Sequence, residues 1–233
     1  RDLHLSIRRQ RQMCMRDSIV APAELPATVL AYKNQQARWA TGATQCLTKY
    51  AAPIWRAPDH SLLARLYALL SMSAYSTHLL LLLILLVQFP LILSGYRFPS
   101  WMIVFSALGL GQPVLFVLAQ QVLYRDWRRR ARHLPALLLL AVGTAPSNTW
   151  AVLRGLFGRG FTFARTPKGP RRSYRLRAGG MLWVEVAFTL YAAAVLVLAL
   201  LTNNTGSVFL PLLCFLGFGY VALRAWRESR ASA

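Results

Sequence analysis

Long apolar segments, separated by short polar or basic ones, occupy most of the chain after residue 73. An apolar helix of about 20 residues crosses the ~30 Å hydrocarbon core of a bilayer. We therefore predict an all-α integral membrane protein, with a transmembrane region over residues 73–233. Its four predicted spans are residues 75–93, 101–123, 181–201 and 208–223.

The apolar segment 136–157 has a different pattern, because the sequence GTAPSN interrupts it at residues 143–148. The apolar half before this break would reach only ~14 Å as a helix. Eight Lys and Arg residues between 154 and 177 also favour the same side of the membrane as the basic residues before the segment. We predict an interfacial or dipping segment, with Ser147 or Asn148 capping its second half. A full fifth span is the alternative, and it would place those eight basic residues outside.

Clustered arginines indicate the topology. Five of them lie between residues 124 and 132, and the positive-inside rule places that loop in the cytosol. The poorly charged turns at 95–100 and 202–207 are then external, on a common side. The basic C-terminus is cytosolic, and so is the helical segment 28–50. The protein is expected in the inner (plasma) membrane as a multi-pass protein.

The composition supports a membrane protein and limits the classes of partner that are expected. The chain is 56% hydrophobic with a formal net charge of +20. Because the basic residues flank apolar spans, they suit anionic lipid and anionic substrate, and no nucleic acid is expected as a partner. The three scattered cysteines, Cys14, Cys46 and Cys214, indicate neither a disulfide framework nor a metal cluster. Since the chain starts at Arg1 and not at Met, we interpret it as the C-terminal part of a longer protein.

Two helices are predicted in residues 28–72, before the first span. The first covers residues 28–50, begins at Thr28 as N-cap, and is expected to end before Ala52 and Pro53. The second covers residues 61–72 and, because it directly precedes a span, is expected at the membrane interface.

Gln35, Arg38 and Trp39 share one face of the first helix, because residues three and four apart are neighbours. An amide hydrogen-bonds hydroxyls, a guanidinium binds phosphate oxygens, and an indole stacks on an apolar ring face. A sugar nucleotide or a growing sugar chain needs these three contacts. An ordinary amphipathic helix with a Trp anchor would show the same spacing.

The sequence Q-x-x-R-W at 35–39 resembles a motif of the processive family 2 glycosyltransferases, of the cellulose-synthase and mannan-synthase type. In that family the motif ends the catalytic domain, and transmembrane helices follow. The sequence FARTPKG at 163–169 is similar to the family's F-x-V-T-x-K-G gating loop, although Arg165 and Pro167 depart from it. DLHLS at 2–6 resembles the T-E-D-x-D-L-S region, with departures at Arg1 and His4.

The resemblance implies roles for these residues. Asp2 would be the catalytic general base, and residues 1–27 the last edge of a GT-A type α/β domain that is mostly missing. Trp39 would stack on the acceptor, with Arg38 and Gln35 near the pyrophosphate and terminal sugar. Residues 158–178 would form a cytosolic gating-type loop. Three of its residues would contact bound ligand: Phe163, Thr166 and Lys168. Lipid-headgroup binding is the alternative for this loop.

The function implied is that of the membrane and acceptor-binding part of a glycosyltransferase. It would transfer sugar from a UDP- or GDP-sugar donor to a growing β-glycan and export the product. Mg²⁺ or Mn²⁺ is implied as cofactor, with no metal ligand expected in this chain, so the chain alone is expected to be inactive. Two alternatives remain open: a non-processive enzyme with a lipid acceptor, and a non-catalytic membrane scaffold or transport protein.

A few polar residues lie inside the predicted spans. Glu185, near the cytosolic end of the third span, is expected to snorkel or to pair with Arg175 or Arg177, and otherwise to mark a pathway. Three glutamines could line a path for sugar or could bridge helices: Gln88, Gln112 and Gln120.

Overall fold

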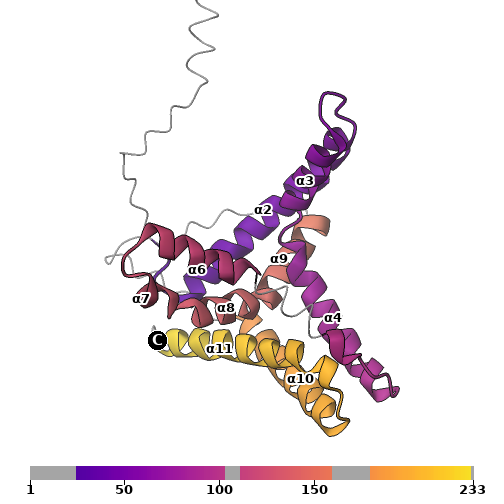
Figure 1. The fold of residues 1–233 in the computed structure, drawn as a ribbon, viewed down its shortest axis with the longest axis vertical. Coiled ribbons are helices and arrows are strands. Elements are labelled where there is room, and N and C mark those ends of the chain that lie inside the picture. Colours follow the sequence, from indigo (N-terminus) through magenta and orange to yellow (C-terminus); the bar gives the residue numbers. More distant parts are fainter. Residues whose placement is uncertain (1–24, 103–110, 159–178, 232–233) are drawn as a thin grey trace, which may run out of the picture.

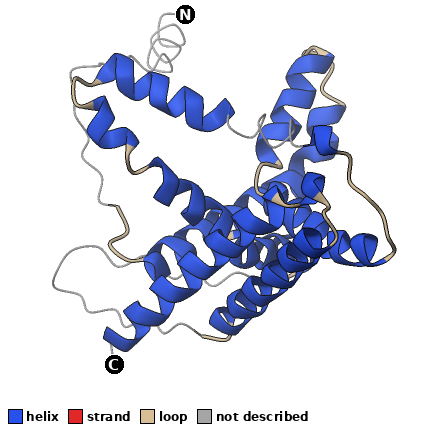
Figure 2. Cartoon of the chain, turned by 60° about the horizontal axis from the view of Figure 1, so that its bottom comes forward, coloured by secondary structure: helices blue, strands red, loops and turns tan. Residues whose placement is uncertain are grey.

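The computed structural model describes residues 25–102, 111–158 and 179–231, and in these ranges it contains helices and turns but no strand (Figures 1 and 2). The all-α prediction is therefore confirmed for the described residues. Residues 1–24, which include most of the predicted catalytic-domain edge, lie outside them. The elements are α2 (Val29–Trp55), α3 (Leu62–Met72), α4 (Ser76–Leu93), η1 (Ser100–Met102), α6 (Gly111–Leu123), α7 (Trp127–Ala131), α8 (Leu134–Gly143), α9 (Ala145–Phe157), α10 (Met181–Leu201), η2 (Thr205–Ser207) and α11 (Phe209–Ala231).

Three helical segments are long and apolar enough to cross a membrane: α4, α10, and η2 with α11. They confirm long apolar helices at the first, third and fourth predicted spans, although α11 continues through the basic tail to Ala231. The predicted span 101–123 is described only in part, by η1 and by the 13-residue helix α6. Residues 103–110 lie outside the description, so this span stays a prediction.

The segment 136–157 is broken, as predicted, into α8 and α9, which meet at an angle of 42°. The predicted cap was wrong, because the break lies at Thr144, and Ser147 and Asn148 are already inside α9. The reason is Pro146: lacking an N–H, it fits the first turn of a helix, and so α9 begins at Ala145. Residues 143–149 are all buried. The bend region therefore packs within the bundle, and the pair α8 and α9 forms either a broken span or a re-entrant segment of the predicted dipping kind.

The two turns that were predicted to share one side of the membrane do lie together. The buried side chain of Asn204 donates from Nδ2 to Tyr96 O (2.9 Å) and accepts at Oδ1 from Phe98 N (3.0 Å). Gly206 lies so close to the other turn that a Cβ there would be 2.5 Å from Phe98 O. A single amide thus joins residues 96–98 to the α10–α11 turn.

Helix α2 is longer than predicted, since it continues through Pro53 to Trp55. The expected break at Pro53 was wrong, because the missing N–H only deprives the carbonyl of the exposed Lys49, which solvent can reach. The predicted N-caps Thr28 and Ser61 are confirmed by their hydrogen bonds from Ala31 N and Ala64 N. After the turn, α3 packs back against α2, and together they form one arm of the molecule (Figure 1).

Candidate functional site

The motif residues Gln35, Arg38 and Trp39 lie in the first half of α2. The helix is regular there, so the three residues share a face as predicted. Trp39 is 54% exposed, whereas Gln35 and Arg38 are half-buried. The other side of the helix is buried, through Lys33, Ala40, Thr41 and Thr44 among others. The arrangement presents the indole outward from a helix that is fixed on its opposite face.

The start of α2 is held by a carboxylate from the last helix of the chain. Glu228 of α11 accepts from Val29 N at Oε1 (2.9 Å) and from Leu30 N at Oε2 (3.1 Å), and Thr28 Oγ1 accepts from Ala31 N (3.1 Å). The first turn of α2 contains no acidic residue of its own. Glu228 therefore satisfies two free N–H groups and places a negative charge at the positive end of the helix dipole.

One turn further along, Lys33 forms a buried ion pair with Glu185 of α10. The Lys33 side chain is 7% exposed and the Glu185 side chain is fully buried. This partner was not predicted from the sequence: Glu185 lies one turn inside α10, on the side that meets α2. Arg175 and Arg177 lie outside the described residues, so their predicted pairing with Glu185 stays a prediction. Each charge of such a pair depends on the other, since either alone would be buried without compensation.

Gln36, inside the motif, is held from the beginning of α4. Tyr75 donates from its hydroxyl to Gln36 Oε1 (3.0 Å). The Tyr75 ring stacks on His78, whose Nε2 lies 3.4 Å from Asn148 Nδ2. A polar connection therefore runs from the motif to the break between α8 and α9.

Small residues bring α2 and α9 into close contact. Thr41 donates from Oγ1 to Ala151 O (3.1 Å), and a Cβ on Gly155 would lie only 2.8 Å from Thr44 Cβ. Such close approach is typical of helix pairs in membranes, where small side chains allow backbones to meet. In total, α2 is fixed by α4, α9, α10 and α11.

Other predicted site residues lie elsewhere or outside the description. Asp2, Phe163, Thr166 and Lys168 are outside the described residues, so their roles stay predictions. Of the glutamines in spans, Gln88 is buried and donates from Nε2 to Ser207 O (2.9 Å), which favours the helix-bridging alternative.

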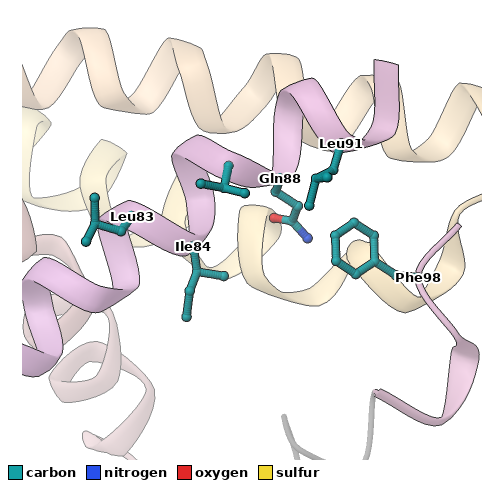
Figure 3. A pocket seen from close by; sticks show the side chains of 6 residues that line it. Leu83, Ile84, Gln88, Leu91 and Phe98 are labelled. Carbon is teal, nitrogen blue, oxygen red and sulfur yellow. The ribbon is translucent and has the colours of Figure 1, made fainter. Parts of the chain in front are cut away.

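A groove of about 240 Å³ lies along α4, and it contains no residue of α2 (Figure 3). Its lining is apolar apart from Gln88: Leu83, Ile84, Val87, Leu91 and Phe98 complete it.

Sequence reasoning missed three residues that position the motif helix: Lys33, Tyr75 and Glu228. A signal for two of the contacts was available, because the whole chain has only seven acidic residues. Two of these seven, Glu185 and Glu228, contact α2. An acid that is rare in a strongly basic membrane chain is a candidate for a specific partner.

Among the described residues no three His, Cys, Asp or Glu side chains gather as a metal site would require. The implied Mg²⁺ or Mn²⁺ therefore stays a prediction. No protein-family model, no curated protein and no solved structure matches the chain. The described residues form an all-helical protein with three, or up to four, helices suited to spanning a membrane, which indicates a multi-pass membrane protein.

Proposed function

We propose that the chain is the acceptor-binding membrane part of a glycosyltransferase, in which α2 holds the end of a saccharide acceptor on Trp39. The observation that carries the proposal is an exposed indole on a helix that four neighbouring helices fix from behind. A stacking platform contributes to catalysis when its position is set before the substrate arrives. The polar contacts of Lys33, Gln36 and Thr41 supply that fixation.

The chemistry of the neighbouring residues suits the same reaction. Transfer from a nucleoside diphosphate sugar develops negative charge on the leaving phosphate, and the Arg38 guanidinium would stabilise it. The Gln35 amide would hydrogen-bond sugar hydroxyls. In this proposal Asp2 deprotonates the acceptor, and Phe163, Thr166 and Lys168 belong to a loop whose closure excludes water. Mg²⁺ or Mn²⁺, when bound, would neutralise the diphosphate, and its ligands are not expected in this chain. The reaction would take place at the cytosolic face of the plasma membrane.

A lipid acceptor is the second candidate, and the environment of Gln88 favours it. Export of a long glycan needs a path lined by hydrogen-bonding groups. The Gln88 amide nitrogen is instead engaged by Ser207 O, between α4 and η2. A short or lipid-linked acceptor needs no such path and would use the same platform at Trp39.

The test measures sugar transfer in membranes that contain the protein expressed from its complete gene, supplied with radiolabelled UDP- and GDP-hexoses. We expect Trp39→Ala to lower incorporation at least tenfold, because misplacing a substrate by about 1 Å can cost about 10²-fold in rate. Trp150→Ala is the matched control: Trp150 is 55% exposed on α9, against 54% for Trp39 on α2.

Two results would contradict the proposal: undiminished incorporation with Trp39→Ala, or no incorporation from any donor by wild-type protein that is correctly inserted. The second result is the one that a non-catalytic scaffold predicts. The product separates the two acceptors, since a glycan polymer is insoluble in ethanol and a glycolipid extracts into chloroform and methanol.

A further inference from the structure

A second exposed aromatic residue lies on the same face of α2 as Trp39. Tyr50 is 45% exposed and eleven residues further along the helix. Eleven residues make slightly more than three full turns, so the two rings lie in line and about 16 Å apart along the axis. Both rings are large flat surfaces directed away from the buried side of the helix.

The surface of α2 between the two rings carries only small side chains. The residues nearest the line that joins them are Gly42, Ala43 and Cys46, none of which is large. A Cβ built on Gly42 would meet nothing within 4 Å, and the Cys46 thiol is exposed. This strip of the helix surface is therefore accessible, and an aromatic ring lies at each end of it.

The polar groups beside this strip are amides and cations. Gln35 and Arg38 lie at the Trp39 end, and Lys49 Nζ lies 5.2 Å from the centre of the Tyr50 ring. No Asp or Glu occurs between Val29 and Trp55. The strip thus repels no anionic ligand, and it offers donors to hydroxyl groups.

The strip differs from the surfaces of this molecule that suit lipid. In α3 no residue is buried, and one face exposes Leu62, Leu63, Leu66 and Leu70. In α2, by contrast, no aliphatic side chain between residues 34 and 50 is exposed. Aromatic rings, small residues, amides and cations without exposed aliphatic groups fit a ligand with apolar faces and hydroxylated edges. Sugar rings have that chemistry.

We propose that Trp39 and Tyr50 are the two ends of one saccharide-binding strip on α2, which takes a neutral or anionic chain of several sugar units. The inference rests on the proposed function and deepens it: the acceptor is an oligosaccharide held over three helical turns. Trp39 binds the sugar at which transfer occurs, and Tyr50 binds a sugar further from it. Affinity should therefore increase with chain length until both rings are covered.

Cys46 provides the readout, because it lies between the rings. The full chain in a neutral detergent is alkylated with N-ethylmaleimide, and the rate at Cys46 is followed by peptide mass spectrometry. The probes are hexasaccharides of glucose, mannose and N-acetylglucosamine, each compared with its monosaccharide. We expect at least one hexasaccharide to slow alkylation fivefold or more and its monosaccharide to have little effect. Tyr50→Ala should remove the difference, whereas Tyr67→Ala, on the 76% exposed Tyr67 of α3, should preserve it.

Two outcomes would overturn the strip. One is the absence of protection by any hexasaccharide. The other is protection of Cys46 by phosphatidylglycerol nanodiscs alone, which would make this face a membrane contact. If either occurs while Trp39→Ala still lowers transfer at least tenfold, the proposed function stands and only the extended strip fails. If Trp39→Ala is also without effect on transfer, both proposals fail.

Discussion

Helices are joined in two different ways in this molecule, and the contacts of α2 with α10 and α11 differ from the crossing of α8 and α11. Where α8 crosses α11 the helices meet closely at two glycines: a Cβ on Gly143 would be 2.3 Å from Gly217 O and 2.3 Å from Val221 Cγ2. Where α2 meets α10 and α11, the contact is made by charged carboxylates, those of Glu185 and Glu228. The first contact depends on shape and the second on charge.

The difference teaches where position is specified in the chain. Close backbone packing fixes helices that lie within the apolar bundle, because small residues leave room for one geometry. A carboxylate that accepts from the first N–H groups of a helix fixes a single terminus, and a buried ion pair fixes a register. Helix α2 has both of these charged contacts, through Glu228 and Glu185. Among the described helices it is also the one that carries the exposed motif residue Trp39.

The largest effect is expected from breaking the ion pair on one side. Lys33→Met leaves the fully buried Glu185 without its partner. Removing one member of a buried pair typically costs 3–5 kcal/mol, so we expect about that loss in the free energy of unfolding. The measurement is the apparent melting temperature of the protein in detergent.

The double variant Lys33→Met with Glu185→Leu is the control for this change. An apolar pair of similar volume is often as stable as the ion pair it replaces, so most of the loss should be recovered. Equal losses in the single and double variants would show that α2 is not held through this charge pair.

The sequence predicted the positions of helices better than the charged contacts between them. Spans such as 181–201 follow from apolar length alone, and α10 occupies those residues. The break in 136–157 followed from Pro146, although its position was displaced because Ser147 and Asn148 were given the capping role. These features are local, and the residues that cause them are neighbours in the chain.

The contacts that position the motif helix α2 could not be predicted in the same way. Glu228 and Val29 are 199 residues apart, and no periodicity relates them. Nothing in the sequence around Lys33 indicates burial, and only the fold reveals that its side chain is 7% exposed beside Glu185. Trp39 was predicted from its spacing to Gln35 and Arg38, but its exposure depends on α9 packing against the other side of α2.

A smaller loss is expected from filling the close crossing of α8 and α11. Gly143→Ala places a methyl group where Gly217 O and Val221 Cγ2 already lie, and overpacking of this kind costs about 1–3 kcal/mol. The melting temperature in detergent should fall accordingly.

Gly42→Ala is the matched control, since nothing lies within 4 Å of its Cβ, and Ala in a helix interior gains about 0.5–1 kcal/mol over Gly. A tolerated Gly143→Ala would mean that the two backbones are not in contact.

The smallest effect is expected at the carboxylate that caps α2. Glu228→Gln keeps the shape of the side chain and one acceptor oxygen, but it removes the charge and one of the two bonds to Val29 N and Leu30 N. Charges at helix ends contribute about 0.3–1 kcal/mol, so global stability should change by no more than about 1 kcal/mol.

The local effect is more informative: hydrogen exchange at the amides of Val29 and Leu30 should accelerate, because opening of the first turn becomes easier. Asp126→Asn is the control, since Asp126 is exposed and pairs with Arg130, four residues further along the chain. Unchanged exchange at residues 29–30 in Glu228→Gln would show that the first turn of α2 is held by Thr28 alone.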